Sequence, residues 1–122
     1  MIGAVLSAAI LSRAWAEQVF VSSITDLPLM AGLSEDADGG MVFDTPSGRI
    51  VDAYAHGWAT RSQVLEFYSS TLPQLGWRPQ GEAAFGREGE ILKLEFPGVE
   101  NSGPDAGPDT VLTVRFHLSP AN

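Results

Sequence analysis

The chain has 122 residues, and its 15 acidic side chains outnumber its 7 Lys and Arg, which gives a formal net charge of −8. This length accommodates one domain, and a hydrophobic share of 44% is sufficient for a packed core. The acidic balance disfavours nucleic acids and anionic lipid surfaces as partners. The chain contains no cysteine, which excludes disulfides, thiolate metal sites, a cysteine nucleophile and a lipid anchor on cysteine.

The start of the chain has the pattern of a secretory signal peptide. The apolar run Ile2–Leu11 is long enough for the hydrophobic region of such a peptide and too short to span a bilayer. Ala14-Trp15-Ala16 offers small residues to a signal peptidase, so we expect cleavage before Glu17. We therefore predict a signal helix over residues 1–16, one domain over 17–122, and a periplasmic or secreted location. Because no basic residue precedes the apolar run, a retained helix associated with a membrane complex is the alternative.

A hairpin is predicted ahead of the main helix. Met41–Asp44 and Arg49–His56 have the composition of strands, and Thr45–Gly48 between them has Pro and Gly at the positions that a tight turn requires. The preceding segment, Ser34–Gly40, is predicted to be an acidic turn. It lacks the later oxygen ligands of an EF-hand, so calcium binding is not expected there.

The stretch from Thr60 to Trp77 predicts the one substantial helix. Thr60 and Gln63 are spaced as a capping box, which satisfies the first backbone N–H groups of a helix. Pro73 is expected to end the regular helix, and Gly76 suits the left-handed residue that closes the last turn. Apolar residues recur at helical spacing and predict the buried side: Val64, Leu65, Phe67, Tyr68, Leu72 and Leu75.

Three further strands are predicted after the helix. Ala83–Arg87 and Glu90–Phe96 flank the two-residue turn Glu88–Gly89, and Thr110–Leu118 closes the chain with strict alternation. Residues 97–109 are rich in Gly and Pro, which predicts a flexible surface loop.

The predicted order is strand, strand, helix, strand, strand, strand. We therefore expect an α+β domain in which a twisted, mostly antiparallel sheet of about five strands carries one main helix on one face. Val51, Ala53 and Ala55 would face the helix, and their small size would let its backbone approach closely. Trp77 would lie at the end of this core.

Three sequence patterns resemble a type of small exported bacterial domain of unknown function. The patterns are F-Y-x3-L-P-x-L-G-W at Phe67–Trp77, F-x-R-E-G-E-x-L-x-L at Phe85–Leu94, and D-L-P-L followed by F-D-T-P-x-G-R-I within Asp26–Ile50. The resemblance implies an exported α+β domain. It implies no catalytic residues.

The sheet face away from the helix carries the candidate binding residues. Alternation places polar and apolar side chains together there if the second and last strands are neighbours. We predict a partner-binding surface made of Ile50, Asp52, Tyr54, His56, Arg115 and His117. Two histidines and an aspartate could instead form a weak transition-metal site, although a solvated face of mixed polarity is the more common explanation.

These observations favour a non-catalytic exported accessory domain that binds a protein of the cell envelope. The contact would use the open sheet face or an edge strand. We expect neither an enzyme nor a cofactor, because the sequence lacks a G-x-S-x-G elbow and a phosphate-binding glycine motif. Two alternatives are a small subunit built into an envelope complex through a retained N-terminal helix, and a binder of a small molecule or metal.

Overall fold

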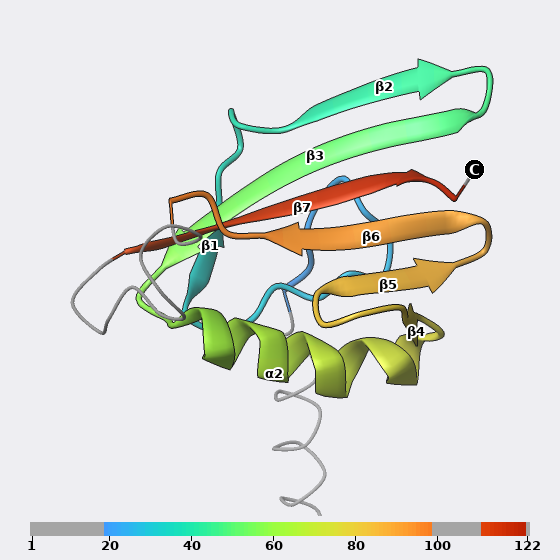
Figure 1. The fold of residues 1–122 in the computed structure, drawn as a ribbon. Helices are drawn as coiled ribbons and strands as arrows, with labels where there is room; N and C mark the ends of the chain where they lie inside the picture. Colours follow the sequence, from blue (N-terminus) through green and yellow to red (C-terminus); the bar gives the residue numbers. More distant parts are fainter. Residues whose placement is uncertain (1–18, 99–110, 122) are drawn as a thin grey trace, which may run out of the picture.

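A computed structural model describes residues 19–98 and 111–121 as one antiparallel sheet with a single helix (Figure 1). The sheet order is β1-β3-β7-β6-β5-β4, and β2 pairs with the part of β3 that β1 leaves open. The helical segments are α2 (Arg61–Thr71) and the 3₁₀ turn η2 (Leu72–Leu75). The strands are β1 (Leu33–Glu35), β2 (Met41–Thr45), β3 (Gly48–Gly57), β4 (Arg78–Pro79), β5 (Ala84–Arg87), β6 (Glu90–Glu95) and β7 (Leu112–Pro120).

The prediction of an α+β domain with a sheet of about five strands was wrong. The described chain is mostly an antiparallel sheet of seven strands, with a helix of 11 residues that η2 extends by 4. The two strands missed are β1, which lies partly inside the predicted acidic turn, and β4. They have 3 and 2 residues, so neither is long enough to display an alternating pattern. The predicted signal helix over residues 1–16 and most of the predicted loop over 97–109 lie outside the described residues.

The helix begins and ends as its local sequence predicts. The Thr60 side chain accepts a hydrogen bond from the Gln63 N–H, and the Gln63 side chain accepts one from the Thr60 N–H, which completes the capping box. The α-helix gives way to η2 at Leu72, one residue before Pro73, whose ring is incompatible with a helix interior. Gly76 then adopts a φ of 93°, a left-handed conformation that favours glycine.

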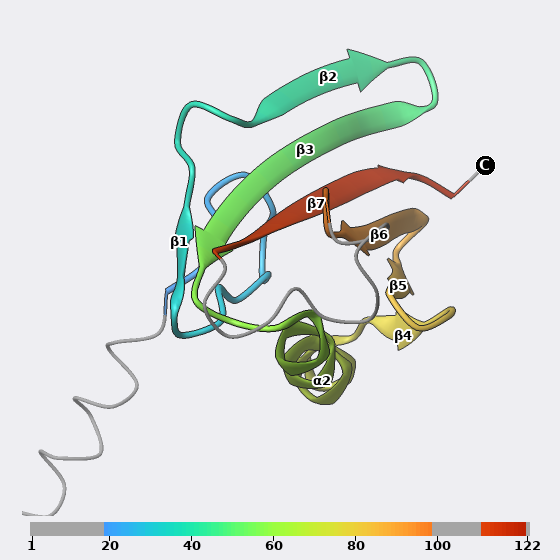
Figure 2. The same ribbon diagram turned by 60° about the vertical axis from the view of Figure 1, so that its left-hand side comes forward.

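The core lies between the helix and the concave side of the sheet. Figure 2 shows the helix end-on, below the sheet as it curves from β3 through β7 and β6 toward β5. Tyr68 and Phe116 are fully buried and pack edge to face, with ring centroids 5.6 Å apart. Trp77 is buried as predicted, and the Arg87 guanidinium lies over its ring at 4.3 Å. The small residues Val51, Ala53 and Ala55 of β3 point to this side.

The irregular segment before β1 closes one side of the core. Val21, Ile24 and Leu27 are buried there, and Tyr68 fixes the segment to the helix through its hydroxyl group. This hydroxyl donates to the Pro28 carbonyl oxygen at 2.8 Å and accepts from the Met30 N–H at 3.2 Å. Burial raises the pKa of the Tyr68 phenol well above its ordinary value, and the hydrogen bond from Met30 offsets only part of that effect.

The longest strand, β3, is paired on one side by β7 along most of its length and on the other by two short strands in succession. β1 pairs with the last three residues of β3, and β2 pairs with its first five. The turn between β1 and β2 interrupts this edge of the sheet. In the part of the chain that the structure describes, no strand pairs with the other side of β2.

Candidate functional site

The pairing of β3 with β7 brings most of the predicted surface residues together. Asp52 lies opposite His117, and Tyr54 lies opposite Arg115. These side chains alternate with buried residues of both strands, so they share the convex face of the sheet, away from the helix. The sequence predicts that these side chains lie together only if the two strands are neighbours, and β3 and β7 are neighbours.

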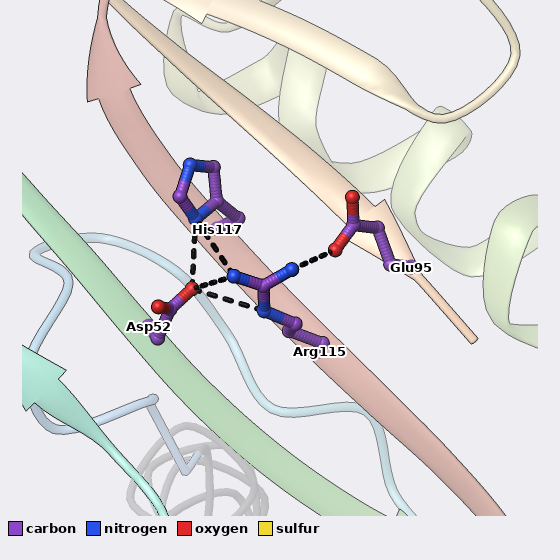
Figure 3. Close-up of polar contacts among 4 residues, drawn as sticks. All are labelled: Asp52, Glu95, Arg115 and His117. Atoms are coloured by element: carbon purple, nitrogen blue, oxygen red, sulfur yellow. Dashed lines mark hydrogen bonds and ion pairs between the residues drawn. The ribbon is translucent and has the colours of Figure 1, made fainter. Parts of the chain in front are cut away.

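Four side chains from three strands form one network on this face, which we call the polar cluster (Figure 3). The Arg115 guanidinium lies between two carboxylates, with Nη2 2.9 Å from Asp52 Oδ1 and Nη1 paired with Glu95 Oε1. The same Asp52 oxygen lies 2.7 Å from His117 Nδ1. Figure 3 shows Asp52 on β3, Arg115 and His117 on β7, and Glu95 on β6, so the polar cluster connects three adjacent strands.

The electrostatics of the polar cluster favour a permanently charged arginine. Partial burial lowers the pKa of Arg115, but the hydrogen bond to Glu95 and the negative charges of Asp52 and Glu95 together outweigh burial and leave the pKa raised. The Asp52 side chain is the least accessible of the four, at 16%. Arg115 and Asp52 therefore pair with each other within the domain.

Chemically, the pair of Asp52 and His117 has part of an acid–base arrangement, because a carboxylate orients the imidazole through Nδ1. A nucleophile for such a pair would have to lie within hydrogen-bond reach of the other ring nitrogen. The contacts described for His117 are with Asp52 and Arg115. The contacts of His117 and Arg115 with Asp52 join β7 to β3 and support the pairing of the two strands.

The second histidine has a separate partner. His56 Nδ1 lies 2.6 Å from Asp36 Oδ1, in the turn that follows β1. The two histidines are thus each bound to a different aspartate and do not converge. Among the described residues, no group of three or more His, Cys, Asp or Glu side chains is placed to hold a metal ion.

A hollow of about 550 Å³ adjoins the polar cluster near the start of the helix. Arg115, Tyr54 and Arg61 contribute to its lining. Both arginines have acidic partners, because Arg61 Nη2 lies 3.1 Å from Glu82 Oε1 and its guanidinium lies over the Phe96 ring. The hollow therefore offers no uncompensated positive charge to an anionic ligand.

The remaining predicted residue, Ile50, leads to a surface that the sequence analysis missed. Ile50 lies opposite Phe43 of β2 on the convex face. Phe43, Val42 and Met41 are 53%, 57% and 49% exposed, although they are consecutive in one strand. We call Met41, Val42, Phe43 and Ile50 the apolar edge patch.

The sequence of β2 is unusual, but it points to burial and not to exposure. Met41-Val42-Phe43 is an unbroken apolar run, whereas a strand with one solvated face alternates apolar and polar residues. The run predicts a strand that is buried on both faces, and the structure instead places it at the edge of the sheet. Val19 and Val111 are also exposed but directly adjoin stretches that the structure does not describe, and Trp58, 67% exposed, is a single exposed side chain in the connection between β3 and α2.

Fold and surface together define a small, mostly β domain with an internally paired polar cluster and the apolar edge patch. Comparisons with protein-family models, with curated proteins and with solved structures returned no match for this chain. No helix within the described ranges has the length and apolar character needed to cross a membrane.

Proposed function

We propose that this chain is a non-catalytic protein-binding domain whose contact surface is the apolar edge patch. The observation that carries the proposal is the exposure of three consecutive apolar side chains on a strand with one unpaired side in the described sheet. Exposed apolar surface of this kind is typical of sites for protein partners. An unpaired strand edge offers backbone hydrogen bonds in addition.

The polar cluster supports the same choice of surface. Its four side chains hold one another, so a partner that bound there would have to displace existing ion pairs. Binding at the apolar edge patch would displace no such ion pairs, and it would remove exposed apolar side chains from water. We therefore narrow the predicted surface from the whole sheet face to its β2 side. Ile50 is retained from the six predicted residues, and Asp52, His56, Arg115 and His117 are assigned a structural role because each is paired within the domain.

The export prediction accompanies this proposal. A domain that leaves the cytoplasm with the signal-like segment over residues 1–16 would meet its partner in the periplasm or outside the cell. An envelope protein is then the expected partner. A retained N-terminal segment would place the same patch on a subunit of a membrane complex.

Site-specific photo-crosslinking in the native host tests the proposal. A photoreactive residue at Val42 is expected to give one specific adduct, and the same residue at Glu66, on the exposed side of α2, is expected to give none. The crosslinked protein is then purified and titrated against the full chain. The double variant Met41→Ser with Phe43→Ser should bind it at least about tenfold more weakly, a loss of roughly 1.4 kcal/mol.

Two outcomes contradict the proposal. Equal adducts at Val42 and Glu66 would indicate non-specific proximity, and unchanged affinity of the double variant would place the contact elsewhere. Glu66→Ser serves as the matched control for the titration, because it alters an exposed residue outside the patch.

A further inference from the structure

We infer that the apolar edge patch receives an extended, positively charged segment of another protein, which pairs with β2 as an additional strand of the sheet. This inference rests on the proposed function and specifies the chemistry of the partner. Three features of the edge carry it: the backbone of β2, the side chains on its two faces, and the surrounding charge.

The backbone of β2 is available for pairing. It forms an antiparallel ladder with β3 along all five of its residues, Met41–Thr45. Every second residue of a strand directs its N–H and C=O away from the neighbour that it pairs with. Natural edge strands are usually protected by lysine, proline or a covering segment, and Met41–Thr45 contains neither residue type. The described chain also places no strand over this side.

The side chains of β2 would contact an added strand on both faces. Phe43 shares the convex face with Ile50, whereas Val42 lies opposite the buried Val51 and therefore points to the concave side. Both Phe43 and Val42 are more than half exposed. A strand laid beside β2 would cover each of them with its own alternating side chains, so its preferred residues are apolar on both faces.

The charge around the edge selects a basic segment. Asp44 is exposed on β2 itself, and Asp38 is exposed in the turn that precedes it. The nearby cation Arg49 is already engaged, with Nε 3.1 Å from Glu90 Oε2. The whole chain carries a net charge of −8, so the long-range field also attracts positive segments. Lys or Arg residues between the apolar positions of the partner would meet this charge.

The same features argue against a second copy of the chain as the occupant. Two copies would each carry a net charge of −8, and this repulsion disfavours their contact. Three half-exposed side chains also provide far less than the ~800 Å² per partner of a typical stable interface. A short strand needs less area, because the main-chain hydrogen bonds supply much of its affinity.

Synthetic peptides added to the full chain test the inference. The probe is a labelled peptide of about eight residues in which Val-Val pairs alternate with Lys-Lys pairs, so that an extended strand carries apolar and basic side chains on both faces, and its length spans β2. The matched controls are the same peptide with Glu in place of Lys, and the Val–Lys peptide with alternate backbone amides N-methylated. Fluorescence anisotropy gives affinity, and hydrogen exchange followed by mass spectrometry reports protection of Met41–Thr45.

We expect the Val–Lys peptide to bind and to slow exchange in β2. N-methylation should weaken binding at least about tenfold, because it removes the strand-pairing donors. Raising the salt from about 0.05 to about 0.5 M should weaken binding severalfold, and so should the double variant Asp38→Asn with Asp44→Asn. The double variant Glu66→Gln with Glu82→Gln matches this change of charge away from the edge and should bind as the wild type does.

Four results would overturn the inference. Equal binding of the Glu peptide would remove the charge preference, and equal binding of the N-methylated peptide would exclude strand addition. A concentration-dependent dimer in sedimentation, abolished by Val42→Lys, would identify a second copy as the occupant. If the protein crosslinked at Val42 binds the domain but the Val–Lys peptide does not, the inference fails while the proposed function stands. Absence of any specific crosslink at Val42 would instead contradict the proposed function itself.

Discussion

Asp52 and His117 lie directly opposite each other on β3 and β7, with Asp52 Oδ1 2.7 Å from His117 Nδ1. The two residues are 65 positions apart in the chain. A shift of one residue in the pairing of these strands would put the two side chains on opposite faces of the sheet, so that one strand would turn its polar side chains toward the core. The contact therefore helps to specify the register of the central strand pair.

Replacing Asp52 with Asn is expected to destabilise the domain. The amide keeps the shape of the side chain but removes the charge that faces Arg115, so the free energy of unfolding should fall by roughly 1.5–3 kcal/mol, the range for hydrogen bonds to charged groups. Urea denaturation followed by circular dichroism measures this change. Asp38→Asn, at an exposed turn residue, should change stability by less than about 0.5 kcal/mol. Equal effects of the two substitutions would show that the polar cluster contributes no specific stability.

Tyr68→Phe should reveal the importance of the attachment between the helix and the segment before β1. The substitution keeps the buried ring but leaves the Pro28 carbonyl and the Met30 N–H without their described partner. We expect a loss of about 1–3 kcal/mol in the free energy of unfolding. Tyr54→Phe, on the half-buried convex face, is the control and should cost less. A Tyr68→Phe protein as stable as the wild type would indicate that water replaces the hydroxyl.

The same tyrosine predicts a dependence of stability on alkaline pH. Because the pKa of Tyr68 is raised in the folded state, the unfolded chain ionises this group first, above the ordinary tyrosine pKa of about 10. The folded chain then holds more protons, and the free energy of unfolding falls as pH rises past that value. Denaturation of wild type and Tyr68→Phe at pH values on both sides of 10 should show their difference in stability shrinking as pH increases. A difference that stays constant would contradict the assignment.

Gly57→Ala should weaken the pairing of β1 with β3. A Cβ atom at Gly57 would lie 2.0 Å from the Gly32 carbonyl oxygen and 3.1 Å from the Leu33 Cα, and backbone atoms cannot move aside without shifting β1. We expect a cost of about 1–3 kcal/mol or more, as found for overpacking in closely packed sites. Gly39→Ala is the matched control, since its Cβ would meet only ordinary contacts of 3.4 Å or longer. Thermal unfolding of both variants gives the comparison, and similar melting temperatures would refute the close approach.

Local features of this fold were predictable because local interactions determine them. The capping box of Thr60 and Gln63 forms within one turn of helix, and the turn at Glu88 and Gly89 has positive φ at both residues, as a two-residue hairpin turn requires. Alternation also assigned the convex and concave residues of β3 and β7. These properties depend on spacing along the chain and not on which strands are neighbours.

The features that were missed depend on tertiary pairing. β4 is a strand because Arg78 and Pro79 lie beside Gly86 and Phe85, and two residues carry no periodicity of their own. The exposure of Met41, Val42 and Phe43 follows from the position of β2 at the edge of the sheet, which no pattern within β2 encodes. The six residues of the predicted surface do lie on one face of the sheet, away from the helix, but three of them (Asp52, Arg115 and His117) belong to a polar cluster that has partners within the domain.

The central position of β7 constrains how the domain can be made. β7 supplies the strand between β3 and β6, yet it comes at the end of the described chain. A ribosome adds residues at about 5–20 per second from the N-terminus, so the hairpin of β2 and β3 emerges seconds before the strand that it must join. Until then β3 and β6 lack the strand that pairs with both of them, and the newly made chain cannot complete its sheet. The domain consequently folds after synthesis of β7, and factors that hold unfolded chains have that interval in which to bind it.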